Sequence, residues 1–149
     1  MDYKDIKFNS LDGEKSINDY KGKNLVLYVY PKDNTKGCTT EALDFNRLLN
    51  EFHENNTEVI GLSKDSIKSH EKFRDKNELK FNILSDEEIK LIDKLGAWKL
   101  KKNYGREYMG VVRSTFIFDK NGNLVKEFLN VRVKDHAEKV LEFVKENLN

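Results

Sequence analysis

The feature that most constrains the fold is an uninterrupted apolar run at residues 25–30, which ends at the only proline of the chain. Leu-Val-Leu-Tyr-Val-Tyr is typical of a strand that is covered on both faces, as in a parallel sheet. Pro31 ends the strand because proline has no N–H to donate to a neighbouring strand. From Ala42 onward the apolar residues follow helical spacing, at Phe45, Leu48, Leu49 and Phe52. The sequence therefore predicts a buried strand that leads directly into an amphipathic helix.

The only cysteine, Cys38, falls between this strand and this helix. The first N–H groups of a helix lack partners and carry partial positive charge, so a thiol placed there ionises more readily. A lone cysteine can also be an inert buried thiol that packs as a small hydrophobic residue. The surrounding threonines and glycine are atypical of a core segment. Thr35 offers a hydroxyl one helical turn before Cys38, and Pro31 can shield the thiolate from water.

The residues around Cys38 resemble the active-site motif of the peroxiredoxins, Pro31-x-x-x-Thr35-x-x-Cys38. The longer run YPKDNTxGCTTEAxDF at residues 30–45 is similar to the subgroup called bacterioferritin-comigratory protein or peroxiredoxin Q. Residues 96–116 and 133–140 resemble the same subgroup, so the resemblance extends over nearly the whole chain.

This resemblance implies a role for five residues. Cys38 would be the nucleophile that attacks the peroxide, and Thr35 would hydrogen-bond the thiolate and the peroxide. Pro31 would shield the pocket. Arg113 would stabilise the thiolate and polarise the peroxide, and Glu41 would orient that arginine. From the residues alone, Arg113 would be interpreted as an exposed strand residue, so its role depends on the resemblance.

The chain departs from the subgroup at two kinds of position. Lys36 stands where the family usually has proline, which predicts a less rigid approach to the cysteine. Leu43 stands where the commonest second, resolving cysteine would be, and the alternative position within residues 73–76 has no cysteine either. The sequence therefore predicts a one-cysteine variant that depends on an external thiol: a thioredoxin-like protein, a glutaredoxin or a low-molecular-weight thiol.

The predicted function is a thiol peroxidase that reduces hydrogen peroxide and alkyl hydroperoxides through a cysteine sulfenic acid, with no metal, haem, flavin or other cofactor. The alternative is a peroxide sensor or redox-regulated binding protein that uses the same cysteine without efficient turnover. Disulfide reduction in the style of thioredoxin is disfavoured because Thr35-x-x-Cys38 lacks the first thiol of a C-x-x-C pair. A Cys-His protease needs a base within reach, and nothing in the sequence brings His53, His70 or His136 to Cys38.

Length and charge set further limits. A chain of 149 residues predicts one domain, residues 1–149. Its 27 Lys and Arg against 26 Asp and Glu give a net charge of +1, which argues against general attraction to nucleic acid or membranes. The basic cluster from Lys99 to Arg106 is therefore interpreted as a solvated loop. One cysteine and no apolar signal segment indicate a cytoplasmic protein, expected to be a monomer or weak dimer.

The pattern predicts an α/β thioredoxin fold with an N-terminal β-hairpin and a helix-strand insertion, in which helices flank a mixed central sheet. The remaining predicted elements follow in chain order. They are a hairpin at 6–17, a strand at 59–62, a helix from Asp65 or Ser66, a strand at 81–84, a helix from Asp86 to Gly96, a polar loop at 99–110, a hairpin of 111–118 with 124–129, and a helix at 135–148.

Overall fold

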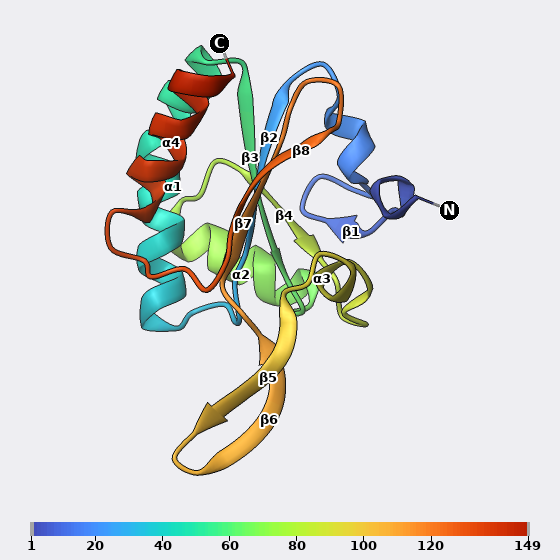
Figure 1. Ribbon diagram of the computed structural model, residues 1–149, viewed down its shortest axis with the longest axis vertical. Coiled ribbons are helices and arrows are strands. Elements are labelled where there is room, and N and C mark those ends of the chain that lie inside the picture. The colour runs from blue at the N-terminus through green and yellow to red at the C-terminus, as the bar shows by residue number, and fades with distance from the viewer. Residues whose placement is uncertain (1, 149) are drawn as a thin grey trace.

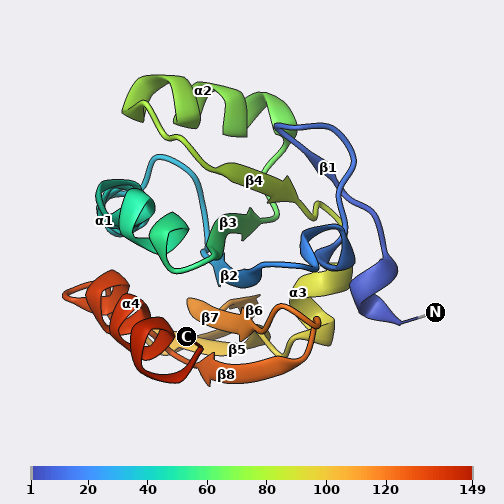
Figure 2. The same ribbon diagram turned by 90° about the horizontal axis from the view of Figure 1, so that it is seen from above.

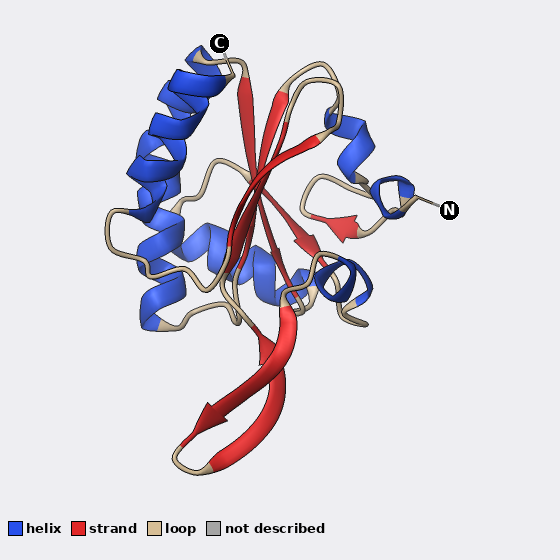
Figure 3. Ribbon diagram, in the orientation of Figure 1, coloured by secondary structure: helices blue, strands red, loops and turns tan. Residues whose placement is uncertain are grey.

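The computed structural model describes residues 2–148, which form eight strands and four α-helices (Figures 1 and 3). Strands and helices alternate as far as α3, and two hairpins and a final helix follow. The helices are α1 (Lys36–Glu54), α2 (Ile67–Asn77), α3 (Lys90–Lys94) and α4 (His136–Asn147). The strands are β1 (Asn9–Ser10), β2 (Asn24–Val29), β3 (Thr57–Ser63), β4 (Asn82–Ser85), β5 (Trp98–Asn103), β6 (Arg106–Val111), β7 (Ser114–Phe118) and β8 (Leu124–Phe128).

Six of these strands form one mixed sheet in the order β1-β4-β3-β2-β7-β8. Strands β2, β3 and β4 run parallel, whereas β1, β7 and β8 pair antiparallel with their neighbours. The central strand β2 is buried along its whole length, as its apolar run predicts. Gly61 of β3 lies opposite Tyr28 and lets the rings of Tyr28 and Tyr30 close over it, because a Cβ there would be 3.2 Å from the Tyr30 ring.

Helices cover both faces of the sheet (Figure 2). Helices α1 and α4 lie side by side, and with α2 they bury one apolar cluster against the sheet, which contains Phe45, Phe52, Phe73 and Val140. The N-terminal segment and α3 bury a second cluster on the opposite face, with Phe8, Ile17 and Leu91 against Leu25 and Leu27. The predicted α/β sandwich with a mixed sheet is therefore confirmed.

Several predicted boundaries differ from the structure. The N-terminal hairpin shortens to one bridge between Phe8 and Lys15, and β1 pairs with β4 instead. The prediction of a loop at residues 99–110 is wrong, because these residues form most of the β5–β6 hairpin. The hairpin projects beyond the sheet (Figure 1), so only Trp98 and Val111 at its base contact the core and most of its residues are exposed. It therefore lacks the alternation that a half-buried strand would show. The helix predicted from Asp86 starts only at Lys90.

The C-terminal end of β2 is the part of the fold that matters for function. The chain leaves β2 at residue 30, turns through residues 31–35 and enters α1, and the β5–β6 hairpin projects from the same end of the sheet (Figure 1). Within residues 2–148, none of the helices combines the length and apolar character needed to cross a membrane.

Candidate active site

Cys38 lies in the first turn of α1, directly beyond the end of β2. Thr35 is the residue that precedes the helix, and its carbonyl oxygen accepts the first helical hydrogen bond, from the N–H of Thr39 at 2.9 Å. The N–H of Cys38 therefore belongs to the initial turn, whose N–H groups lack intrahelical partners. The side chain of Cys38 is only 1% exposed. The thiol is thus both buried and at the positive end of a helix.

Arg113 brings a guanidinium to this thiol from a distant part of the sequence. It lies between β6 and β7, and its Nη2 atom donates to Cys38 Sγ at 3.3 Å. Its Nη1 atom donates to Glu41 Oε1 at 2.7 Å. Gly37 permits this approach, because a Cβ at that position would be 3.3 Å from Arg113 Nη2. The predicted cysteine, arginine and glutamate therefore lie together in one cluster.

Burial and charge control the state of this cluster. Burial raises the pKa of Glu41 to about 7, although the neighbouring Arg113 cation opposes that shift. Glu41 Oε2 is buried and has no hydrogen-bond partner among the described residues. Burial would lower the pKa of Arg113, but Glu41 and Cys38 together raise it. The guanidinium is therefore a fixed positive charge placed between two groups that can each become anions.

Thr35 and Pro31 occupy the rim of the site. The Thr35 hydroxyl is exposed and donates to the carbonyl of Lys32 at 3.1 Å, and no hydrogen bond joins it to Cys38 in the part of the chain that the structure describes. Pro31 is partly buried and, with Arg113, lines a cavity of about 590 Å³ whose other walls are β5 and the segment after β8. Arg113 thus forms part of the wall of this cavity.

A second polar cluster beside the site was not predicted. Asp33, two residues after Pro31, accepts hydrogen bonds from Tyr30 Oη at 2.6 Å, Ser69 Oγ at 2.7 Å and His70 Nδ1 at 2.8 Å. Burial would raise the pKa of Asp33, but the hydrogen bonds from His70, Tyr30 and Ser69 outweigh it and hold the pKa below its ordinary value. The sequence contains no spacing that links a loop aspartate to a histidine on a later helix.

None of the three histidines supplies a base to Cys38. His53 pairs with Glu58, His70 with Asp33, and His136 with Thr115. Burial, together with Lys139 and Arg113, lowers the pKa of His136 to about 4, so this ring is neutral near pH 7. Among residues 2–148, no group of three or more His, Cys, Asp or Glu side chains has the arrangement of a metal site. The arrangement is unlike that of a Cys-His protease.

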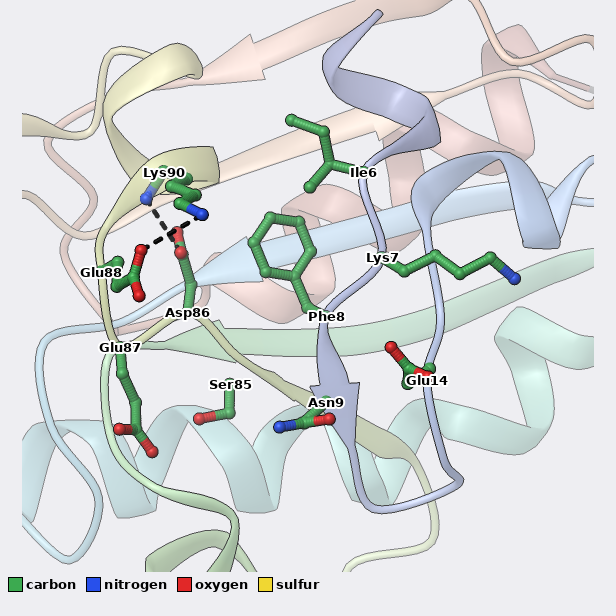
Figure 4. Close-up of a pocket in the computed structure, with 10 residues that line it drawn as sticks. All are labelled: Ile6, Lys7, Phe8, Asn9, Glu14, Ser85, Asp86, Glu87, Glu88 and Lys90. Atoms are coloured by element: carbon green, nitrogen blue, oxygen red, sulfur yellow. Dashed lines mark hydrogen bonds and ion pairs between the residues drawn. The ribbon is translucent and has the colours of Figure 1, made fainter. Parts of the chain in front are cut away.

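A separate cavity of about 340 Å³ lies between the N-terminal segment and the start of α3 (Figure 4). Asp86 is its most buried acidic residue, and its carboxylate accepts the backbone N–H groups of Lys90, Leu91 and Ile92 at 2.8 Å each. This carboxylate therefore caps α3, and the cavity contains none of the five predicted site residues.

Comparisons with known proteins identify the family of the chain. Residues 2–127 match the profile of the AhpC/TSA family. Peroxiredoxin Bcp of Bacillus subtilis is 49% identical over 143 residues, which cover 95% of this chain and 91% of that protein. A putative peroxiredoxin Bcp of Helicobacter pylori is 45% identical over 139 residues, or 93% of this chain and 91% of that one.

A solved structure of the bacterioferritin comigratory protein of Xanthomonas campestris superimposes with a TM-score of 0.92 at 37% identity, covering 97% of this chain and 92% of that one. The architecture is thus the thioredoxin fold as peroxiredoxins build it. The chain belongs to the AhpC/TSA family, within the Bcp or peroxiredoxin Q group of peroxiredoxins, and carries a single cysteine.

Proposed function

We propose that this peroxiredoxin, a thiol-dependent peroxidase, uses Cys38 as the nucleophile that reduces hydrogen peroxide and alkyl hydroperoxides. The observation that carries the assignment is the contact of 3.3 Å between Arg113 Nη2 and the buried Cys38 Sγ. A guanidinium in direct contact with sulfur favours the thiolate, which is the reactive form of cysteine. The Xanthomonas relative, whose structure was studied for alkyl peroxide reduction, supports the substrate class.

In the proposed reaction the Cys38 thiolate attacks the nearer oxygen of the peroxide. A bond forms between sulfur and this oxygen while the O–O bond breaks, and the bonding electrons leave with the farther oxygen as hydroxide or alkoxide. The leaving oxygen then takes a proton and departs as water or an alcohol. Sulfur is oxidised by two electrons to the sulfenic acid.

Charge develops on the two separating oxygens, and the site offers donors for it. Arg113 can turn one N–H toward the peroxide while Glu41 holds its other end. The free N–H groups of the first turn of α1 supply further donors, and Thr35 can join them when its hydroxyl turns from Lys32 toward the substrate. One well-aligned donor of this kind is worth about 10²- to 10³-fold in rate.

Return to the thiol requires two thiol equivalents from outside the chain. The first attacks sulfur, expels water and leaves a mixed disulfide, and the second releases Cys38 as the thiol. We assign this role to a thioredoxin-like protein, a glutaredoxin or a low-molecular-weight thiol. Dependence on such thiols suits a reducing compartment, so we place the reaction in the cytoplasm, with the protein acting as a monomer or weak dimer.

The test is peroxide consumption over many turnovers with a bacterial thioredoxin system or dithiothreitol as reductant. The wild-type protein is expected to consume many equivalents, and Cys38→Ser none, since a serine hydroxyl does not ionise near neutral pH. Glu51→Gln, a change on an exposed face near the C-terminal end of α1, controls for general effects of substitution. Turnover of Cys38→Ser above a few per cent of wild type would refute the nucleophile. A single equivalent consumed by the wild type would instead favour a peroxide sensor.

A further inference from the structure

The side chain of Asp33 fastens the loop before Cys38 to helix α2. Asp33 is 5% exposed, and its carboxylate accepts from two consecutive residues in the first turns of α2, Ser69 and His70. Its backbone N–H donates to Asp65 Oδ2 at 2.9 Å, and Asp65 lies in the connection between β3 and α2. Both the backbone and the side chain of this loop residue are therefore bound to one neighbouring segment.

The state of His70 follows from these contacts. Because Asp33 is a carboxylate, it can only accept, so Nδ1 of His70 carries the proton of this hydrogen bond. Nε2 of His70 is buried and has no partner among the described residues, and the side chain is fully buried. His70 is thus a hydrogen-bond donor dedicated to Asp33.

The rest of the loop is held less firmly. Asn34 adopts a left-handed backbone with φ of 64°, which costs energy for a residue with a Cβ. The Thr35 hydroxyl is exposed and donates within the loop, to the carbonyl of Lys32. Two anchors therefore bracket the first turn of α1: Asp33 on α2 at one end, and Glu41 on Arg113 at the other.

Burial of Cys38 creates a requirement that the closed loop does not meet. Cys38 is 1% exposed, so a thiol reductant, which is larger than hydrogen peroxide, needs a larger opening of the loop to reach its sulfur. Because the chain has one cysteine, every turnover needs such a reductant to reach this sulfur. The segment between the two anchors must therefore open after oxidation and close again before the next peroxide arrives.

We propose that the Asp33–His70 hydrogen bond is the latch that holds the loop of Cys38 closed, and that its release admits the reducing thiol to the oxidised sulfur. This inference rests on the proposed function and adds two positioning residues to it, Asp33 and His70, which touch neither peroxide nor sulfur. A latch of this kind sets the population of the open form. Weakening it raises the rate of any step that needs the open form.

The experiment replaces His70 and measures access to sulfur in both oxidation states. His70→Leu removes the donor, whereas His70→Asn keeps an amide nitrogen near the position of Nδ1. Reduced protein is alkylated with a bulky fluorescent maleimide. Protein oxidised with one equivalent of hydrogen peroxide is mixed with 5-thio-2-nitrobenzoate, which forms a mixed disulfide with a sulfenic acid and releases water. His53→Leu, at a half-exposed histidine that pairs with Glu58, is the matched control.

Both rates are expected to rise about tenfold in His70→Leu, the lower end of what loss of one hydrogen bond to a charged acceptor produces. In His70→Asn and His53→Leu they are expected to stay within about twofold of wild type. Unchanged or slower rates in His70→Leu would overturn the latch. An equal rise in Leu91→Ala, a core change on the opposite face of the sheet, would also overturn it, because faster access would then follow from general destabilisation. If His70→Leu does not fold, His70→Phe keeps an aromatic ring at this buried position but cannot donate to Asp33, and the same rise is required of it.

The two readouts separate this inference from the proposed function. Maleimide access needs no peroxide chemistry, so it tests the latch even if Cys38 were not the peroxidatic residue. A wild-type protein that forms no sulfenic acid would refute the proposed function alone. A wild-type protein that forms it, with maleimide access unchanged in the folded His70→Leu variant, would refute the latch alone.

Discussion

Arg113 Nη2 lies 3.3 Å from Cys38 Sγ although 75 residues separate the two in the sequence. The contact depends on the short break between β6 and β7, which turns the Arg113 side chain toward the first turn of α1. The guanidinium is planar, so its second amino group reaches Glu41 at the same time. One side chain thereby links the Cys38 sulfur to a buried carboxyl group on the same helix.

Arg113→Lys is expected to lower the rate of reaction with hydrogen peroxide by at least about 100-fold, because an ammonium cannot match the fork that bonds sulfur, carboxylate and peroxide together. The measurement is single-turnover oxidation followed by rapid quenching and intact mass. Alkylation of Cys38 by iodoacetamide at fixed pH is expected to fall less, by under about tenfold, since the positive charge remains. Lys145→Arg, a change between the same two residue types at an exposed ion pair on α4, is the control. Near-normal peroxide kinetics in Arg113→Lys would show that charge alone suffices.

Excess peroxide is expected to add one oxygen to Cys38 and then two or three, because no second thiol in the chain can trap the sulfenic acid. Intact mass and peptide mapping follow the products. A disulfide-linked dimer through Cys38 on a non-reducing gel would point to resolution between two copies of the chain. Persistence of the unmodified thiol in excess peroxide would contradict the assignment of Cys38.

Gly37→Ala is expected to separate stability from activity. Its helical backbone accepts alanine, which favours a helix over glycine by up to ~1 kcal/mol, so urea unfolding should show equal or higher stability. The new Cβ would lie 3.3 Å from Arg113 Nη2 and push the guanidinium by a few tenths of an ångström. The peroxide rate is then expected to fall about tenfold. Lys36→Ala, in the same turn, is the control that leaves Arg113 in place, and a rate for Gly37→Ala equal to wild type would show that Arg113 adjusts freely.

Much of the fold is visible in the sequence because its strongest patterns are local. The apolar run of β2, the stop at Pro31 and the periodicity of α1 each follow from neighbours in the chain. The turn of the last hairpin is likewise marked by Asn121 and Gly122, and its strands pair as predicted. Of the two residues predicted to cap α2, Asp65 and Ser66, it is Ser66 that accepts a hydrogen bond from the N–H of Ser69.

The parts that escaped prediction depend on contacts between distant segments. Most of the β5–β6 hairpin is exposed, and its apolar residues Leu100, Tyr108 and Met109 face solvent, so no buried face marks its strands in the sequence. In the sequence Arg113 looks like an ordinary strand residue. Its contact with Cys38 forms only when β7 pairs with β2. The Asp33–His70 pair needs both the loop after β2 and the first turns of α2 in place, and each residue alone has an unremarkable polar setting in the sequence.

Glu41 gives the last prediction, which concerns stability and pH. Its carboxyl group is 1% exposed, and its pKa is raised by burial from 4.5 to about 7. Between these two pH values, the carboxyl proton of Glu41 is therefore bound more tightly in the folded state than in the unfolded state. Stability from this group is fully present below about pH 4.5 and is lost as pH rises to about 7, an effect of at most about 3 kcal/mol.

Glu41→Gln removes the titration but keeps an oxygen that can accept from Arg113 Nη1. The free energy of unfolding, measured in urea from about pH 4.5 to about pH 8, is expected to fall more with rising pH in the wild type than in the variant. Subtracting the free energies of unfolding of the two proteins removes the contributions of the other titrating groups. Glu51→Gln, on an exposed face of the same helix, is expected to follow the wild type. Parallel curves for Glu41→Gln and wild type would mean that Glu41 stays ionised throughout this range, with Arg113 fully compensating its burial.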